Sequence, residues 1–145
     1  MDPTPLEDLG HVIQLSIAPV FLLTAVGTIL SVLSARLGRI VDRSRTLHDR
    51  RLNTDADRRQ AMDDELVLLG RRRHLVTLAI TFGTVTALLV CVLIAVTFVG
   101  YLVHVSIGMM VASLFVLAMA CFILALVSFL REVRLASATR HHESH

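Results

Sequence analysis

The sequence predicts an all-α integral membrane protein with three transmembrane helices and a helical hairpin between the first and the second. Two long runs without Asp, Glu, Lys or Arg carry this prediction, at residues 12–34 and 75–130. A transmembrane helix needs about 20 mostly apolar residues, each adding about 1.5 Å of length. The first run therefore fits one span and the second fits two. The hydrophobic fraction of 54% and the mean hydropathy of +0.70 also exceed those of ordinary soluble domains.

Taken in order, the elements form a single membrane domain over residues 1–145. The spans are expected at about 12–34, 75–99 and 106–130, with a turn between the last two near residues 99–108, where Tyr101 and His104 lie. The hairpin is expected at residues 35–74, and a short tail at 131–145.

The positions of the basic residues predict how the chain is oriented. All 14 are arginines, and each lies between the first and second spans or after the third, whereas the first ten residues carry only acidic charge. Cytoplasmic segments of membrane proteins are enriched in basic residues. We therefore expect the N-terminus outside and the hairpin and C-terminus in the cytosol. This agrees with three spans, because an odd number of spans places the two termini on opposite sides of the membrane.

An apolar stripe continues from the first span into the hairpin. Leucines and an isoleucine recur at intervals of three, four or seven residues without an intervening proline, which is typical of one helix that continues to about Arg51. A second helix carries Met62, Leu66 and Leu69 on one face. The members of the first stripe are Leu30, Leu33, Leu37, Ile40 and Leu47.

Nucleic-acid binding is not expected. Residues 35–74 contain eleven arginines but also seven acidic residues, and no Phe, Tyr or Trp that could stack on bases. A solvated segment beside anionic membrane lipids accounts for the charge.

The spans carry stripes of small residues. Such stripes let helix backbones approach closely in a bilayer and therefore mark helix–helix contacts. They serve either the packing of the chain on itself, or self-association or docking into a larger membrane protein complex. Five positions form the candidate helix-packing interface: Gly27 and Ser31 in the first span, and Ala79, Gly83 and Ala87 in the second. In the second span the four-residue repeat continues to Cys91 and Ala95.

A cluster of charges follows the first span and forms a candidate patch for lipids or a partner: Arg36, Arg39, Asp42 and Arg43. Arg39 and Arg43 lie one helical turn apart and could bind a lipid phosphate or a partner's carboxylate. The alternative is that the cluster only sets topology and forms local salt bridges.

No chemistry-bearing motif is found. The spans contain no Asp, Glu, Lys or Arg, which ion-coupled carriers and pumps nearly always need. The sequence lacks HExxH, GxSxG and phosphate-binding glycine loops. We therefore expect no catalytic residue, no cofactor and no metal site, and a non-enzymatic protein.

Two functions remain open. The first is a structural or accessory subunit that associates through the small-residue faces. The alternative is a homo-oligomeric channel lined by Thr77, Thr81 and Thr84, with the arginines at 71–73 at its mouth, which would favour anions.

The segment IAPVFLLTAVGTILSVLSARLGRIVDRSR at residues 17–45 resembles the signature of a bacterial membrane protein family known only as a domain of unknown function, DUF2721. The matching parts are APVFLLT at 18–24 and RLGRIVDR at 36–43. The resemblance implies a small multi-pass protein of the bacterial inner (plasma) membrane with no assigned activity, and it supplies no catalytic residue.

Overall fold

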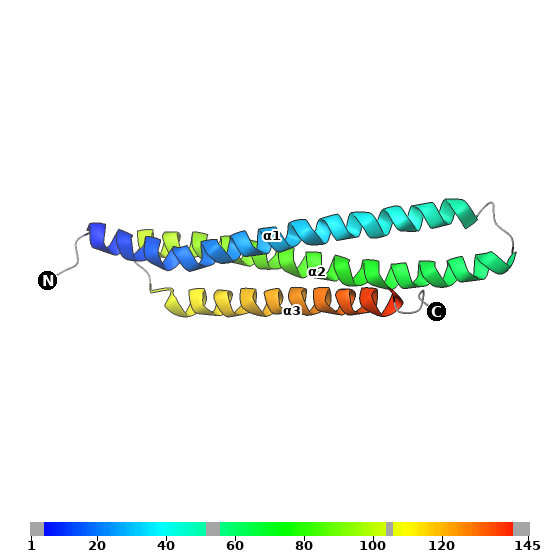
Figure 1. Ribbon diagram of the computed structural model, residues 1–145. Coiled ribbons are helices and arrows are strands. Elements are labelled where there is room, and N and C mark those ends of the chain that lie inside the picture. Colours follow the sequence, from blue (N-terminus) through cyan, green and yellow to red (C-terminus); the bar gives the residue numbers. More distant parts are fainter. Residues whose placement is uncertain (1–4, 52–55, 104–105, 141–145) are drawn as a thin grey trace. The chain divides into compact units, whose positions relative to one another are not determined.

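The computed structural model describes residues 5–51, 56–103 and 106–140, and these form three α-helices (Figure 1). They are α1 (Pro5–Arg51), α2 (Ala56–Val103) and α3 (Gly108–Arg140). No strand occurs in these ranges. His104, in the turn expected between the second and third spans, lies outside the described residues.

All three helices contain a segment long and apolar enough to cross a membrane: Ile13–Arg50, Met62–Val103 and Gly108–Ala136. This confirms the predicted fold class and the number of helices, and such a chain is a multi-pass membrane protein. Helix α1 continues without a break from its apolar segment into the arginine-rich segment. It ends at Arg51, as its apolar stripe predicts.

The helix ends do not coincide with the ends of the expected spans: α1 begins at Pro5 and α3 at Gly108. Helix α2 continues to Val103, past the expected end at residue 99, because its sequence stays apolar and contains no proline there. Helix α3 continues through the expected tail to Arg140. The tail residues up to 140 include Glu, Arg, Leu and Ala, which favour helix.

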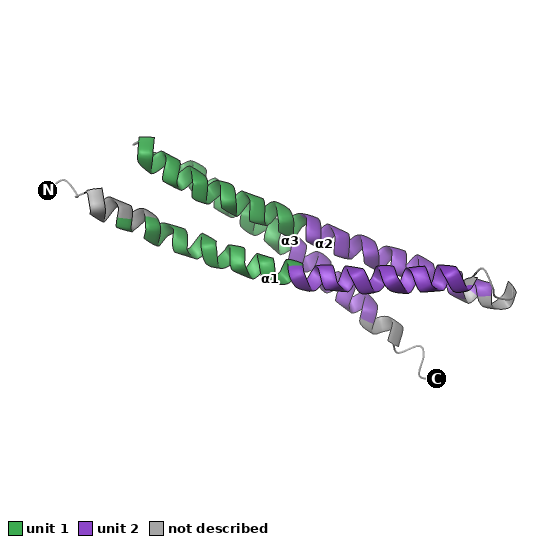
Figure 2. Cartoon of the chain, turned by 90° about the horizontal axis from the view of Figure 1, so that it is seen from above, with its two compact units in different colours: residues 1–30, 82–123 green, residues 31–81, 124–145 purple. Residues whose placement is uncertain are grey.

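By its internal contacts the chain divides into two compact units, coloured separately in Figure 2. Unit 1 consists of Met1–Leu30 and Phe82–Ile123, and unit 2 of Ser31–Thr81 and Leu124–His145. Each unit contains part of all three helices. The expectation of a single membrane domain stays a prediction.

The buried positions of each helix follow a seven-residue repeat. Such a repeat keeps one face of a helix toward its neighbours and is typical of left-handed coiled-coil packing. In α1 the buried positions include Pro19, Val26, Leu33, Ile40 and Leu47; in α2 they include Val76, Gly83 and Val90; in α3 they are Ala118, Ala125 and Glu132. Leu33, Ile40 and Leu47 belong to the stripe found in the sequence, which is thereby confirmed as the buried face.

Within unit 1, close contacts join the helices. A Cβ atom on Gly83 would lie 2.9 Å from Cδ2 of Leu30, so the glycine of α2 lets α1 approach. The buried hydroxyl of Thr86 donates to the carbonyl of Phe82 at 2.9 Å and lies 3.5 Å from that of Ala118 in α3. Gly83 of α2 thus serves packing inside the unit.

Candidate functional site

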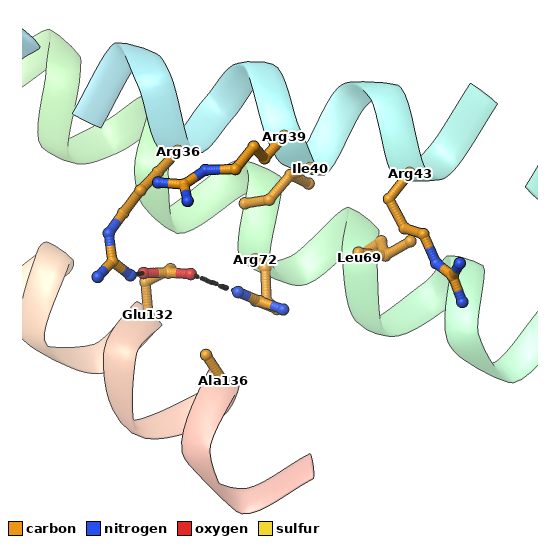
Figure 3. Close-up of a pocket in the computed structure, with 8 residues that line it drawn as sticks. All are labelled: Arg36, Arg39, Ile40, Arg43, Leu69, Arg72, Glu132 and Ala136. Atoms are coloured by element: carbon orange, nitrogen blue, oxygen red, sulfur yellow. Dashed lines mark hydrogen bonds and ion pairs between the residues drawn. The ribbon is translucent and has the colours of Figure 1, made fainter. Parts of the chain in front are cut away.

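Unit 2 contains a cavity of about 270 Å³ whose lining is dominated by arginines (Figure 3). Helix α1 contributes arginines on successive turns, α2 contributes one more, and α3 contributes a single carboxylate. Ile40, Leu69 and Ala136 supply the apolar part of the wall. The charged lining residues are Arg36, Arg39, Arg43, Arg72 and Glu132.

Glu132 is the centre of this site. Its side chain has no exposed surface, and both of its carboxylate oxygens accept hydrogen bonds from arginines. Nη1 of Arg36 donates to Oε2 at 3.1 Å, while Nη2 and Nε of Arg72 donate to Oε1 at 2.8 and 3.3 Å. A buried charge is tolerated only when it is paired and hydrogen-bonded in this way. One carboxylate on α3 therefore ties α1 to α2.

The repeat of α3 explains why the carboxylate is buried. Glu132 lies seven residues after Ala125 and fourteen after Ala118, both of which are buried. It therefore occupies the inward face of the helix. Phe129, one turn earlier, places its ring 5.1 Å from the guanidinium carbon of Arg36, which is cation–π distance. Arg36 is thus held by two side chains of α3.

The two remaining arginines of α1 differ from each other. Arg43 pairs across the hairpin with Glu65 of α2, with a 2.9 Å contact from Nη2 to Oε1. Arg39 is exposed, and its guanidinium extends back along α1 toward Arg36 (Figure 3). Arg39 has no ion pair with any residue that the structure describes.

The charged cluster marks the end of the apolar segments of all three helices. Arg36 is the first charged residue after the run at 12–34, and Glu132 follows the run that ends at residue 130 by two positions. Arg72 precedes the start of that run at residue 75 by three positions. Charged side chains at this point lie where a hydrocarbon core gives way to headgroups.

The structure brings together three of the four residues of the predicted lipid or partner patch. Arg36, Arg39 and Arg43 line the cavity, whereas Asp42 is exposed and does not line it. Sequence reasoning missed Glu132 and Arg72. The signal for Glu132 was available, since it continues the seven-residue spacing of small residues in α3 just beyond the last apolar run.

The predicted helix-packing positions separate into two groups. Ala79 and Gly83 are buried and Ala87 is half-buried, but the repeat becomes exposed at Cys91 and Ala95. Four residues of α-helix turn through about 400°, so a four-residue stripe rotates away from a fixed contact face. The corresponding stripe of α1 lies outside the packing: Gly27, Ser31 and Ala35 are exposed, and no atom lies within 4 Å of a Cβ on Gly27.

The threonines that could line a channel are exposed on α2. The hydroxyl of Thr77 donates to the carbonyl of Arg73, and that of Thr81 to the carbonyl of Thr77, both at 2.9 Å. Within the described ranges, no group of three His, Cys, Asp or Glu side chains could hold a metal ion.

Comparison with known proteins supports the resemblance drawn from residues 17–45. The sequence model of a family described as Protein of unknown function (DUF2721) matches residues 16–141, which is most of the chain. No match was found among curated proteins or among solved structures. The three apolar helices and the family match together describe a membrane protein of unknown activity, and the chain belongs to the DUF2721 family.

Proposed function

We propose that the protein is a non-enzymatic structural or accessory subunit of a membrane protein assembly. It lies in the bacterial inner membrane with its N-terminus outside and its hairpin and C-terminus in the cytosol. It associates with a second copy or a larger complex through α1. It contacts membrane lipids at its arginine cluster, the arginines that line the cavity of unit 2.

The observation that carries this proposal is the unused small-residue face of α1. Gly27, Ser31 and Ala35 recur every four residues and are all exposed, and a Cβ on Gly27 would meet nothing within 4 Å. Gly83 of α2, in contrast, already packs against Leu30. Because small residues gain little from contact with lipid tails but permit close helix contact, an outward-facing stripe favours another helix as its neighbour.

The test replaces the stripe with a bulky residue. Gly27→Leu would hold a partner helix away, whereas Ala25→Leu makes a similar enlargement at an exposed position on another side of α1. We expect native mass spectrometry in mild detergent to show an oligomer or a complex with a stoichiometric partner for the wild type and Ala25→Leu. For Gly27→Leu, the fraction of the protein found in that oligomer or complex should fall about tenfold. A wild type recovered only as a lone monomer would contradict the proposal, as would equal effects of the two variants.

A second candidate function is a homo-oligomeric channel, which the exposure of Thr77, Thr81 and Thr84 favours. These hydroxyls lie on one side of α2 and are not buried by the chain itself. Anion flux into liposomes, present for the wild type and abolished by Thr81→Phe, would support this function over the first. A channel would also require recovery of a symmetric homo-oligomer without other subunits.

A further inference from the structure

We propose that the arginine-lined cavity of unit 2 is a binding site for one phosphate oxyanion, held by Arg36, Arg39 and Arg72. The ligand chemistry is that of a phospholipid headgroup or of free phosphate. This inference rests on the proposed function, because it identifies the ligand that the arginine cluster recognises.

The first argument is charge. Four arginines line the cavity with only one carboxylate, that of Glu132. That carboxylate is shared by Arg36 and Arg72, and Arg43 has its own partner in Glu65. Arg39 makes no ion pair with any described residue, so an anion in the cavity would meet an arginine without a carboxylate partner. A guanidinium has five N–H donors, and Glu132 accepts one from Arg36 and two from Arg72, so further donors remain.

The second argument is preorganisation. Arg36 is fixed by Glu132 on one side and by the ring of Phe129 at 5.1 Å. Arg72 is fixed by two hydrogen bonds to the same carboxylate. In Figure 3 the guanidinium of Arg39 lies toward Arg36, while Arg43 points away on the far side of Leu69. Side chains already held in place lose less conformational entropy when a ligand binds.

The third argument is the surroundings of the cavity. The cavity has a volume of about 270 Å³, and Ile40, Leu69 and Ala136 form an apolar wall beside its arginines. Such a wall suits the carbon atoms that follow a phosphate ester. The cluster also lies where the apolar runs of the three helices end, which is the depth of phospholipid phosphates. Arginine forms charge-assisted, often bidentate hydrogen bonds with phosphate oxygens.

The experiment uses the full-length protein in mild detergent and three separate probes. These are phosphatidylglycerol, zwitterionic phosphatidylcholine and inorganic phosphate. Native mass spectrometry measures lipids retained per chain, and the shift of the unfolding temperature measures free phosphate. Arg39→Gln removes the unbalanced guanidinium at an exposed position. Arg73→Gln makes the same change at an exposed arginine that borders the second apolar run but does not line the cavity.

We expect one phosphatidylglycerol to be retained by the wild type and by Arg73→Gln, and about tenfold weaker binding by Arg39→Gln, because a charge-assisted hydrogen bond is lost. Phosphatidylcholine should bind at least tenfold more weakly, since its choline adds positive charge. If millimolar phosphate raises the unfolding temperature of the wild type and displaces the lipid, the ligand is free phosphate. If it does neither, the ligand is the lipid.

The proposal is overturned if Arg39→Gln binds phosphatidylglycerol as the wild type does. It is also overturned if the two variants lose binding equally, because diffuse attraction would then be the cause, or if no probe binds the wild type. Association is measured on the same samples. Wild-type protein that associates but retains no probe would count against this site alone, and wild-type protein that retains phosphatidylglycerol but does not associate would count against the subunit role alone.

Discussion

The buried carboxylate of Glu132 predicts a large and specific loss of stability when its charge is removed. Glu132→Gln keeps the shape of the side chain but loses the charge, and its amide group faces arginine donors. The wild-type carboxylate accepts hydrogen bonds from Arg36 at 3.1 Å and from Arg72 at 2.8 and 3.3 Å. Hydrogen bonds to charged groups contribute roughly 1.5–3 kcal/mol each, and breaking a buried ion pair costs roughly 3–5 kcal/mol.

The partial exposure of the two arginines lowers the expected loss. The side chains of Arg36 and Arg72 are 34% and 24% exposed, so water can solvate part of the charge that the substitution leaves unpaired. We therefore expect Glu132→Gln to lower the free energy of unfolding by about 2–4 kcal/mol. The matched control is Glu65→Gln, which breaks the pair with Arg43. Because those side chains are 39% and 52% exposed, the loss should stay below about 1 kcal/mol.

The assay is equilibrium unfolding in mixed micelles, with helical circular dichroism as the signal and the denaturing detergent as the variable. A double-mutant cycle between Glu132→Gln and Arg72→Gln isolates the pair, with an expected coupling above about 1 kcal/mol. Equal losses for Glu132→Gln and Glu65→Gln, or a coupling near zero, would refute the assignment of Glu132 as the residue that joins the three helices.

Two further predictions concern helix packing and topology. Gly83→Leu should lower the free energy of unfolding by about 1–3 kcal/mol in the same assay, because even a Cβ there lies 2.9 Å from Leu30, whereas Gly27→Ala should have no cost. An equal effect at both glycines would contradict the packing. Topology is tested in a variant without native cysteines, with a membrane-impermeant maleimide added to intact cells. Gln60→Cys should resist the maleimide and Met109→Cys should react with it. Labelling of Gln60→Cys would contradict the predicted orientation.

The amino-acid sequence by itself determined the three helices and where their apolar segments end. Hydrocarbon thickness sets the length of a span and charge sets its ends, and both are properties of a continuous segment of chain. The two charge-free runs therefore predicted three helices, and the stripe through Leu33, Ile40 and Leu47 predicted both the continuation of α1 to Arg51 and its buried face. The resemblance at residues 17–45 was likewise readable from the chain, and the family match confirms it.

Only the tertiary structure decided which side chains meet. Arg36, Arg39 and Arg43 were recognisable as a basic cluster on one helix, but Glu132, the partner of Arg36, lies 96 residues farther along the chain. Likewise, Gly83 and Gly27 both lie in four-residue repeats of small residues, yet one packs against Leu30 and the other is exposed. The physical reason is rotation about the helix axis. A repeat in the sequence defines a face, but the neighbouring helices determine which face is buried and which is left for lipid or a partner.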